Sequence, residues 1–201
     1  VTNAMITDWR TRWGEGDYPF YVVQIPGQQN VSNNPLVREQ QNEALKLKNT
    51  AVAVIMDTGE PKNVHPHNKE PLGERLAKIA LANAYGQKIE YSGPVFDSLK
   101  IEGNKAIVTF THTDGELVAK GGPLKWFQVA GEDRKFHDAR AEISGDCVVV
   151  TSPEVNNPVA VRYAWANFPE GANLYNKEGL QASPFRTDRW DYPIEGIVES
   201  P

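Results

Sequence analysis

The sequence lacks the features that mark membrane-spanning and disulfide-stapled proteins. Its longest unbroken apolar run extends only from Ala51 to Met56, whereas a helix that crosses a bilayer needs about 20 apolar residues. Its single cysteine, Cys147, cannot close an internal disulfide, and it lies in a β-branched run (CVVV). We therefore expect no membrane span, and we interpret Cys147 as a small buried apolar residue.

An excess of basic charge is also missing. The 201 residues carry 21 Lys and Arg against 26 Asp and Glu, a net charge of −5. The imbalance is uneven, because residues 1–90 hold ten basic and ten acidic side chains, while residues 91–201 hold eleven and sixteen. This distribution argues against a nucleic-acid partner and favours two modules.

The first module has the pattern of an α/β unit. Apolar spacing and β-branched runs predict, in order, a helix over 4–13, a strand over 20–25, a helix over 35–48, a strand over 50–56 and a helix over 69–85. Two strands joined by a helix are expected to be parallel. Since a parallel sheet exposes apolar surface on both faces, we expect further strands to be supplied from elsewhere.

The second module has the pattern of a β-sandwich. Short alternating or β-branched segments predict strands over 88–91, 98–102, 106–110, 125–130, 139–143, 147–151 and 160–164. Hairpin-type turns such as Thr113-Asp-Gly115 and Ser144-Gly-Asp146 separate several of them. This density of strands is typical of two packed antiparallel sheets.

Two residues on one loop are candidates for chemistry. Asp57 ends the second strand of the α/β unit, and His65 follows just ahead of the next helix. Reacting groups gather at the carboxyl ends of strands in such sheets. A histidine there can serve as a general base, oriented by a carboxylate on its second nitrogen. The alternative for Asp57 is a turn-forming side chain that bonds the amides of Thr58 and Gly59.

No nucleophile accompanies this base. No serine lies in a G-x-S-x-G pattern, and a reactive thiolate is disfavoured at Cys147. His65 and His67 have no third His or Cys nearby, so they make a poor metal site. His67, His112 and His137 are weaker candidates for catalysis, and no cofactor or metal is expected.

A succession of blocks resembles the sialate O-acetylesterase-like carbohydrate esterases of the SGNH-hydrolase superfamily. The match runs in order over nearly the whole chain. The blocks are Ile6-Thr-Asp-Trp-Arg-x-x-Trp13-Gly, Gly16-Asp-Tyr-Pro-Phe20, Asp57-x-Gly59-x-Pro-x-Asn-Val-His65-Pro-x-Asn-Lys69, Leu72-Gly-x-Arg-Leu-Ala77, Pro158-Val-Ala-Val-Arg-Tyr163-Ala-Trp165, Asn173-Leu-Tyr-Asn176 and Ser183-Pro-Phe-Arg-Thr-Asp188.

The resemblance implies a serine esterase that removes acetyl groups from sialic acid or another acetylated sugar. In that family the serine lies in an upstream Gly-x-Ser block, and only the histidine block maps across, onto His65. The superfamily has an Asp three residues before the histidine, where this chain has Lys62. Asp57 is our first candidate to orient the imidazole, and Asn63 or Glu60 are the alternatives.

The resemblance also sets our expectation for the architecture. Residues 1–91 are expected to be the C-terminal portion of an SGNH-type three-layer α/β/α parallel-sheet domain, and residues 92–201 a β-sandwich with an extended tail. We expect a second polypeptide that carries the serine block, or self-association, and no activity of the chain alone. Secretion or a periplasmic location is expected from the family.

A different class of function competes with the esterase. In it the chain is a non-catalytic carbohydrate-binding or domain-interaction protein that acts through residues 92–190. Trp9, Arg10 and Trp13 could line a sugar cleft, although packing within the fold is the preferred interpretation. The tail from Phe185 to Trp190 could stack on sugars, or it could dock the end of the chain onto the first module, which we prefer.

Overall fold

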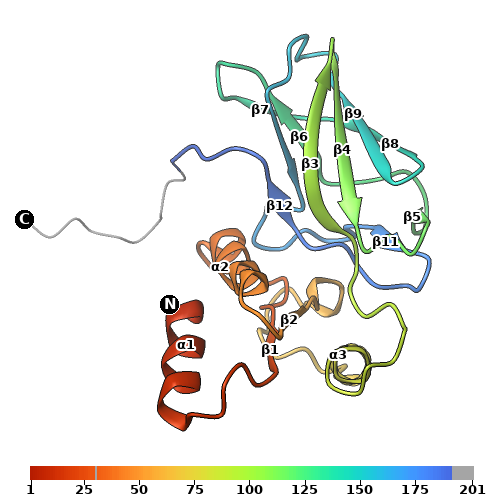
Figure 1. Cartoon of the computed structure of the whole chain (residues 1–201). Coiled ribbons are helices and arrows are strands. Elements are labelled where there is room, and N and C mark those ends of the chain that lie inside the picture. The colour runs from red at the N-terminus through yellow and green to blue at the C-terminus, as the bar shows by residue number, and fades with distance from the viewer. Residues whose placement is uncertain (30, 192–201) are drawn as a thin grey trace, which may run out of the picture.

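The computed structural model describes residues 1–29 and 31–191. Helices and a parallel strand pair form one end of the molecule, and antiparallel sheets form the other (Figure 1). The first part contains α1 (Thr2–Trp13), β1 (Phe20–Val23), α2 (Asn34–Asn42), η1 (Glu43–Lys46), β2 (Thr50–Ala53), η2 (Met56–Thr58) and α3 (Glu70–Asn83). None of the helices in the described ranges is long and apolar enough to cross a membrane.

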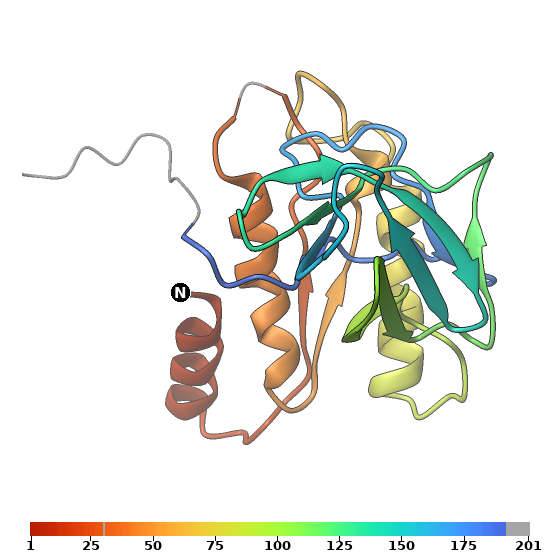
Figure 2. The ribbon, with the colours of Figure 1, turned by 90° about the horizontal axis from the view of Figure 1, so that it is seen from above.

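The parallel pair is sandwiched between helices. β1 and β2 pair in parallel, as the sequence predicts, with Phe20 opposite Thr50 and Val23 opposite Ala53. Side chains alternate between the two faces. Val22 and Val52 pack with Ile6 of α1 on one face, while Ala51 and Ala53 pack with Ile79 of α3 on the other. Figure 2 shows α1 and α2 on one side of the strands and α3 on the opposite side.

Several of the expected elements are shorter than predicted, and two differ most. The helix expected over 35–48 keeps α-helical geometry only to Asn42 and continues as the 3-10 turn η1. The strand expected to reach Met56 ends at Ala53, because Met56 already begins the 3-10 turn η2. The expected SGNH arrangement of a larger parallel sheet remains a prediction, since the described parallel sheet has two strands.

The second part consists of short antiparallel strands. They are β3 (Val95–Glu102), β4 (Lys105–Thr111), β5 (Leu117–Ala119), β6 (Phe127–Ala130), β7 (Phe136–Asp138), β8 (Arg140–Ser144), β9 (Cys147–Thr151), β10 (Ala160–Tyr163), β11 (Leu174–Asn176) and β12 (Phe185–Arg186). Two sheets of four strands have the orders β3-β4-β9-β8 and β12-β10-β6-β7, and β11 pairs with β5. Val108, Val148, Val129 and Val161 from both larger sheets share one apolar core.

One expected strand is wrong. Residues 88–91 have neither helical nor strand geometry. The reason is local, because Glu90 Oε1 accepts hydrogen bonds from the backbone N–H groups of Tyr91 (2.9 Å) and Ser92 (3.0 Å). Those donors are therefore satisfied by a side chain instead of a neighbouring strand. The segment serves as the connection between the two parts, and the predicted domain boundary at 91/92 stays a prediction.

Candidate functional site

The loop between β2 and α3 carries His65. It begins at the carboxyl end of β2, passes through η2 and reaches His65 just before α3. The imidazole of His65 is exposed to solvent, and none of the described residues forms a hydrogen bond with it. The structure therefore presents His65 as an unpaired base at the edge of the sheet where the sequence places it.

Two side chains within this loop fix its backbone. Asn63 Oδ1 accepts the backbone N–H of His65 at 2.9 Å, and Glu60 Oε1 accepts the backbone N–H of His67 at 2.6 Å. Glu60 also pairs with Nδ1 of His67, which lies 2.9 Å from each carboxylate oxygen. These bonds from His67 lower the pKa of Glu60. The Glu60 carboxylate therefore stabilises the bend of the loop. It pairs with His67 and not with His65.

A close glycine contact joins this loop to the one that follows β1. A Cβ atom built on Gly59 would lie 2.5 Å from the carbonyl oxygen and 2.6 Å from the nitrogen of Gly27. Beyond the contact, the N–H of Gln29 donates to the carbonyl of Pro61 at 2.8 Å. Only a residue without a side chain fits between the two loops at position 59.

Asp57 lies in η2, at the start of the loop that carries His65. Its two carboxylate oxygens accept hydrogen bonds from Nη1 (2.7 Å) and Nη2 (2.6 Å) of Arg75, and Oδ2 also accepts the hydroxyl of Tyr175 at 3.3 Å. Its backbone N–H donates to Gln181 Oε1 at 2.9 Å. Arg75 comes from α3, whereas Tyr175 and Gln181 come from the second part of the chain.

This cluster is shielded from water, and it shifts the ionisation of Tyr175. The Asp57 side chain is 21% exposed and the Arg75 side chain 11%. Burial raises the pKa of Tyr175, and the charge of Asp57 raises it further because both groups would be anionic. Asp57 therefore connects the two parts of the molecule through a partly buried ion pair and a neutral phenol.

None of the side chains expected to orient His65 contacts its ring through a hydrogen bond among the described residues. Asp57 is bound to Arg75 and Tyr175, Glu60 to His67, and Asn63 to the backbone of residue 65. None of these three side chains hydrogen-bonds to the His65 ring in the part of the chain that the structure describes. The roles of His65 and Asp57 in catalysis stay predictions.

Sequence reasoning missed the buried arginine of α2. Arg38 of α2 is completely buried, and it donates to the main-chain carbonyls of Ile25, Pro26, Ala166 and Asn167 at 2.7–3.1 Å. Burial lowers the pKa of Arg38 to about 10. Through these hydrogen bonds, Arg38 connects the loop after β1 to the loop at residues 166–167 of the second part.

The tail docks onto the first part, as preferred from the sequence. Arg186 Nε and Nη2 donate to the carboxylate of Glu39 on α2 at 2.8 and 3.0 Å. Asp188 accepts two hydrogen bonds of 2.9 Å from Arg162 of β10. Arg186 and Asp188 of the tail are thus engaged within the fold.

The aromatic helix face departs from our preferred interpretation. Arg10 is packed, as expected, and donates to the carbonyl of Tyr18 at 2.7 Å. Trp9 and Trp13 are instead 42% and 63% exposed, and their rings stack with centroids 6.0 Å apart. They form an uncovered aromatic surface.

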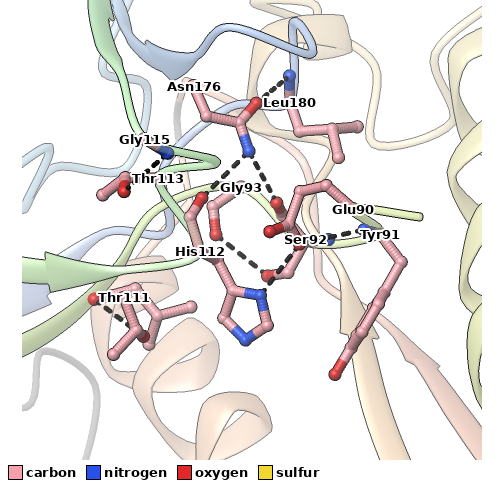
Figure 3. A network of polar contacts seen from close by, with 11 residues as sticks. Glu90, Tyr91, Ser92, Gly93, Thr111, His112, Thr113, Gly115, Asn176 and Leu180 are labelled. Atoms are coloured by element: carbon pink, nitrogen blue, oxygen red, sulfur yellow. Dashed lines mark hydrogen bonds and ion pairs between the residues drawn. The ribbon is translucent and has the colours of Figure 1, made fainter. Parts of the chain in front are cut away.

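His112, a weaker candidate for catalysis, belongs to a polar network that joins the connecting segment to the antiparallel sheets (Figure 3). Its Nδ1 lies 2.9 Å from Glu90 Oε1. Asn176 Nδ2 donates to the carbonyls of Ser92 (2.9 Å) and His112 (3.0 Å), and Asn176 Oδ1 accepts the N–H of Leu180. His137 pairs with Glu154 at 2.7 Å. Within residues 1–29 and 31–191, no three His, Cys, Asp or Glu side chains gather closely enough to hold a metal.

Comparison with known proteins identifies the relatives of the chain. No protein-family model matches it. A solved structure described as a novel carbohydrate acetylesterase from Xanthomonas citri superposes with a TM-score of 0.90 at 43% sequence identity, over 93% of this chain. The chain is a homologue of carbohydrate acetylesterases. The resemblance inferred from the sequence blocks is thereby confirmed.

Curated homologues give the same result. The sialate O-acetylesterases of Pongo abelii and Homo sapiens are each 26% identical over 213 aligned positions that include 90% of this chain. The chain spans less than half the length of these acetylesterases, because the match covers 40% of each curated relative and 45% of the solved structure.

Proposed function

We propose that the chain is one portion of a carbohydrate O-acetylesterase, in which it supplies the histidine base while the serine nucleophile comes from outside these residues. The substrate would be an acetyl ester of a sugar such as sialic acid. One observation carries the proposal: the exposed, unpaired imidazole of His65 at the carboxyl end of β2. The similarity to a sialate O-acetylesterase and to a carbohydrate acetylesterase supports the substrate class.

His65 would move a proton twice in this reaction. It would accept the hydroxyl proton of the serine as the oxygen attacks the acetyl carbonyl, and return that proton to the departing sugar oxygen. It would then take a proton from water, whose oxygen attacks the acetyl-enzyme, and acetate would leave as the serine regains its proton. The chain's contribution is thus proton transfer at one imidazole.

We assign the neighbouring groups to positioning. Asn63 and Glu60 hold the backbone on either side of His65 through the bonds at 2.9 and 2.6 Å. Asp57 holds the base of the loop through Arg75, and it would have to give up these contacts to reach the ring. The polypeptide that carries the serine block would complete the site.

Hydrolysis of p-nitrophenyl acetate tests the proposal. The chain is assayed alone and after co-expression with the remaining portion of the Xanthomonas citri acetylesterase. We expect esterase activity only in the co-expressed sample, and a loss of at least about 100-fold in kcat with His65→Ala, because proton transfer by a positioned base contributes 10²–10⁴-fold. The control is His137→Ala, which removes a surface histidine paired with Glu154. Enzyme-like hydrolysis by the chain alone would contradict the proposal.

A further inference from the structure

We propose that Gln181, in the second part of the chain, is a positioning residue for His65. Its side chain holds the first turn of the loop that carries the base, and it does so through the main chain of Asp57. The inference rests on the proposed function, because it names a residue that determines where the proposed base lies. It gives the antiparallel part of the chain a role in catalysis at a distance from the reacting atoms.

The Gln181 side chain is buried, and both ends of its amide are bound. Only 2% of the residue is exposed. Its Oε1 accepts the backbone N–H of Asp57 at 2.9 Å, and its Nε2 donates to the carbonyl of Ala172 at 2.9 Å. Because the first partner is a donor and the second an acceptor, the two bonds fix the orientation of the amide. The side chain thus links the start of the His65 loop to residue 172 of the second part.

The 3-10 turn η2 needs an acceptor from outside. Within the turn, the N–H of Thr58 donates to the carbonyl of Ile55 (3.2 Å) and the N–H of Gly59 to that of Met56 (3.3 Å). The first N–H groups of a helical turn have no acceptor inside the turn, and the N–H of Asp57 is one of them. Gln181 supplies the missing acceptor, so the turn is completed by the second part of the chain.

The backbone that carries Gln181 is firmly placed. It forms an antiparallel bridge with Tyr175 of β11, and the next amide, that of Ala182, donates to the carbonyl of Leu174 at 2.9 Å. On the other side, a Cβ built on Gly93 would collide with the carbonyl oxygen of Gln181, so the connecting segment packs directly against it. An amide on such a backbone is a fixed point to which a loop can be attached.

The loop that carries His65 is held at both ends. Gln181 holds its first turn, and Arg75 of α3 binds the Asp57 carboxylate from beyond its last residue, at 2.7 and 2.6 Å. His65 lies between η2 and α3, so its position depends on both contacts. A base must lie within hydrogen-bond reach of the proton that it takes, and a misplacement of about 1 Å can lower the rate about 100-fold. Loss of the Gln181 contact should therefore slow proton transfer by an intact His65.

The substitution Gln181→Glu separates this positioning role from packing. The two side chains have the same shape, and a protonated carboxyl group can still accept the N–H of Asp57 and donate to the carbonyl of Ala172. An ionised carboxylate has no proton to donate to Ala172, and it places a second negative charge beside Asp57. Burial and this like charge raise the pKa of the introduced carboxyl group above its ordinary value of about 4.3. The variant therefore resembles the parent in mild acid and loses the link as the pH rises.

Hydrolysis of p-nitrophenyl acetate between about pH 5 and 8 tests the inference. The chain is assayed after co-expression with the remaining portion of the Xanthomonas citri acetylesterase. We expect kcat of Gln181→Glu to match the parent at the acid end and to be at least about tenfold lower at pH 8. KM should stay within about twofold, since Gln181 is buried behind the loop and does not bind the substrate.

The matched control is Asn173→Asp, which makes the same change from amide to carboxyl. Asn173 is 6% exposed, and its amide bonds only to groups of the second part, namely the carbonyls of Lys120, Gly122 and Pro123 and the N–H of Lys125. We expect kcat of this variant to follow the pH dependence of the parent. Circular dichroism checks that each variant is folded.

Amide hydrogen exchange measures the same contact without reference to activity. In Gln181→Met, which has neither hydrogen bond, exchange at the Asp57 amide should be at least about tenfold faster than in the parent chain, while exchange at Val52 in β2 is unchanged. Unchanged exchange at Asp57 would overturn the inference, because the side chain would then not hold the turn.

The outcomes separate this inference from the proposed function. If the parent complex shows no His65-dependent hydrolysis, the proposed function fails and the inference fails with it. If hydrolysis depends on His65 but Gln181→Glu has the pH profile of the parent, the inference alone is overturned. It is also overturned if Asn173→Asp changes the profile in the same way, since the effect would then come from general packing of the second part.

Discussion

Asp57 and Arg75 form a two-point ion pair, with Oδ1–Nη1 at 2.7 Å and Oδ2–Nη2 at 2.6 Å, beneath the loop that carries His65. Nη1 of Arg75 also donates to the carbonyl of Val54 at 2.6 Å, just after β2. The pair therefore fixes the end of the strand, the start of the loop and α3 relative to one another. Its partner Tyr175 extends this connection into the second part of the molecule.

Removing one member of this pair should destabilise the fold. We expect Asp57→Ala to lower the free energy of unfolding by about 3 kcal/mol, because it leaves the largely buried guanidinium of Arg75 without a counter-charge. Urea unfolding followed by circular dichroism measures the change. The matched control is Asp8→Ala, which removes an exposed ion pair with Arg12 and should cost no more than about 0.5 kcal/mol. Equal effects of the two variants would show that Asp57 does not hold the loop.

The contact between Gly59 and Gly27 should make position 59 intolerant of any side chain. A methyl group in Gly59→Ala would meet the backbone of Gly27 at 2.5–2.8 Å, and we expect a loss of about 2 kcal/mol or more in unfolding free energy as the two loops separate. Gly73→Ala is the control, since a Cβ at Gly73 on α3 meets nothing within 4 Å. There the change should stabilise the helix by up to about 1 kcal/mol. A neutral Gly59→Ala would refute the close approach.

The buried phenol of Tyr175 predicts a loss of stability in alkali. Burial and the charge of Asp57 raise the pKa of Tyr175, so above about pH 10 the unfolded chain releases a phenol proton that the folded chain retains. The unfolded state then binds fewer protons, and the free energy of unfolding falls as the pH rises. Urea unfolding between pH 9 and 11.5 should show a shallower fall in Tyr175→Phe than in the parent chain.

Two features of that experiment keep it specific. Tyr85→Phe is the control, because Tyr85 is 76% exposed, and it should leave the slope unchanged. Tyr163, whose pKa is also raised by burial, should leave a residual alkaline slope in Tyr175→Phe. An identical slope in the parent chain and in Tyr175→Phe would contradict the prediction.

The elements that could be predicted from the sequence are those that bury a regular apolar pattern. β9 was predicted with its observed bounds because CVVVT combines β-branched residues with a hairpin turn before it. β11 and β12 have only three and two residues, too few to show an alternation. The strand prediction for Lys88–Tyr91 is wrong because the Glu90 side chain accepts the backbone N–H groups that a neighbouring strand would otherwise bind. A hydrophobic pattern does not reveal such an acceptor.

The candidate site was predictable in position but not in its contacts. His65 and Asp57 share the loop that the strand pattern indicates, yet the partners of Asp57 come from α3 and from residues more than 100 positions away. One signal was present: Arg75 has the helical spacing of Leu72, Leu76 and Ile79, so a charged residue on an apolar face required a buried partner. No pattern in the sequence around Asp57 or Arg75 indicates that Tyr175 supplies part of this contact.

Arg38 differs from the other charged links between the two parts in having no acidic member. Its acceptors are four peptide carbonyls, none of which takes up a proton in the range where carboxylates do. The links made by Asp57 and Glu39 depend on a carboxylate, whereas the hydrogen bonds of Arg38 need no acidic partner. The attachment of the loop after β1 to residues 166 and 167 is therefore independent of any carboxylate.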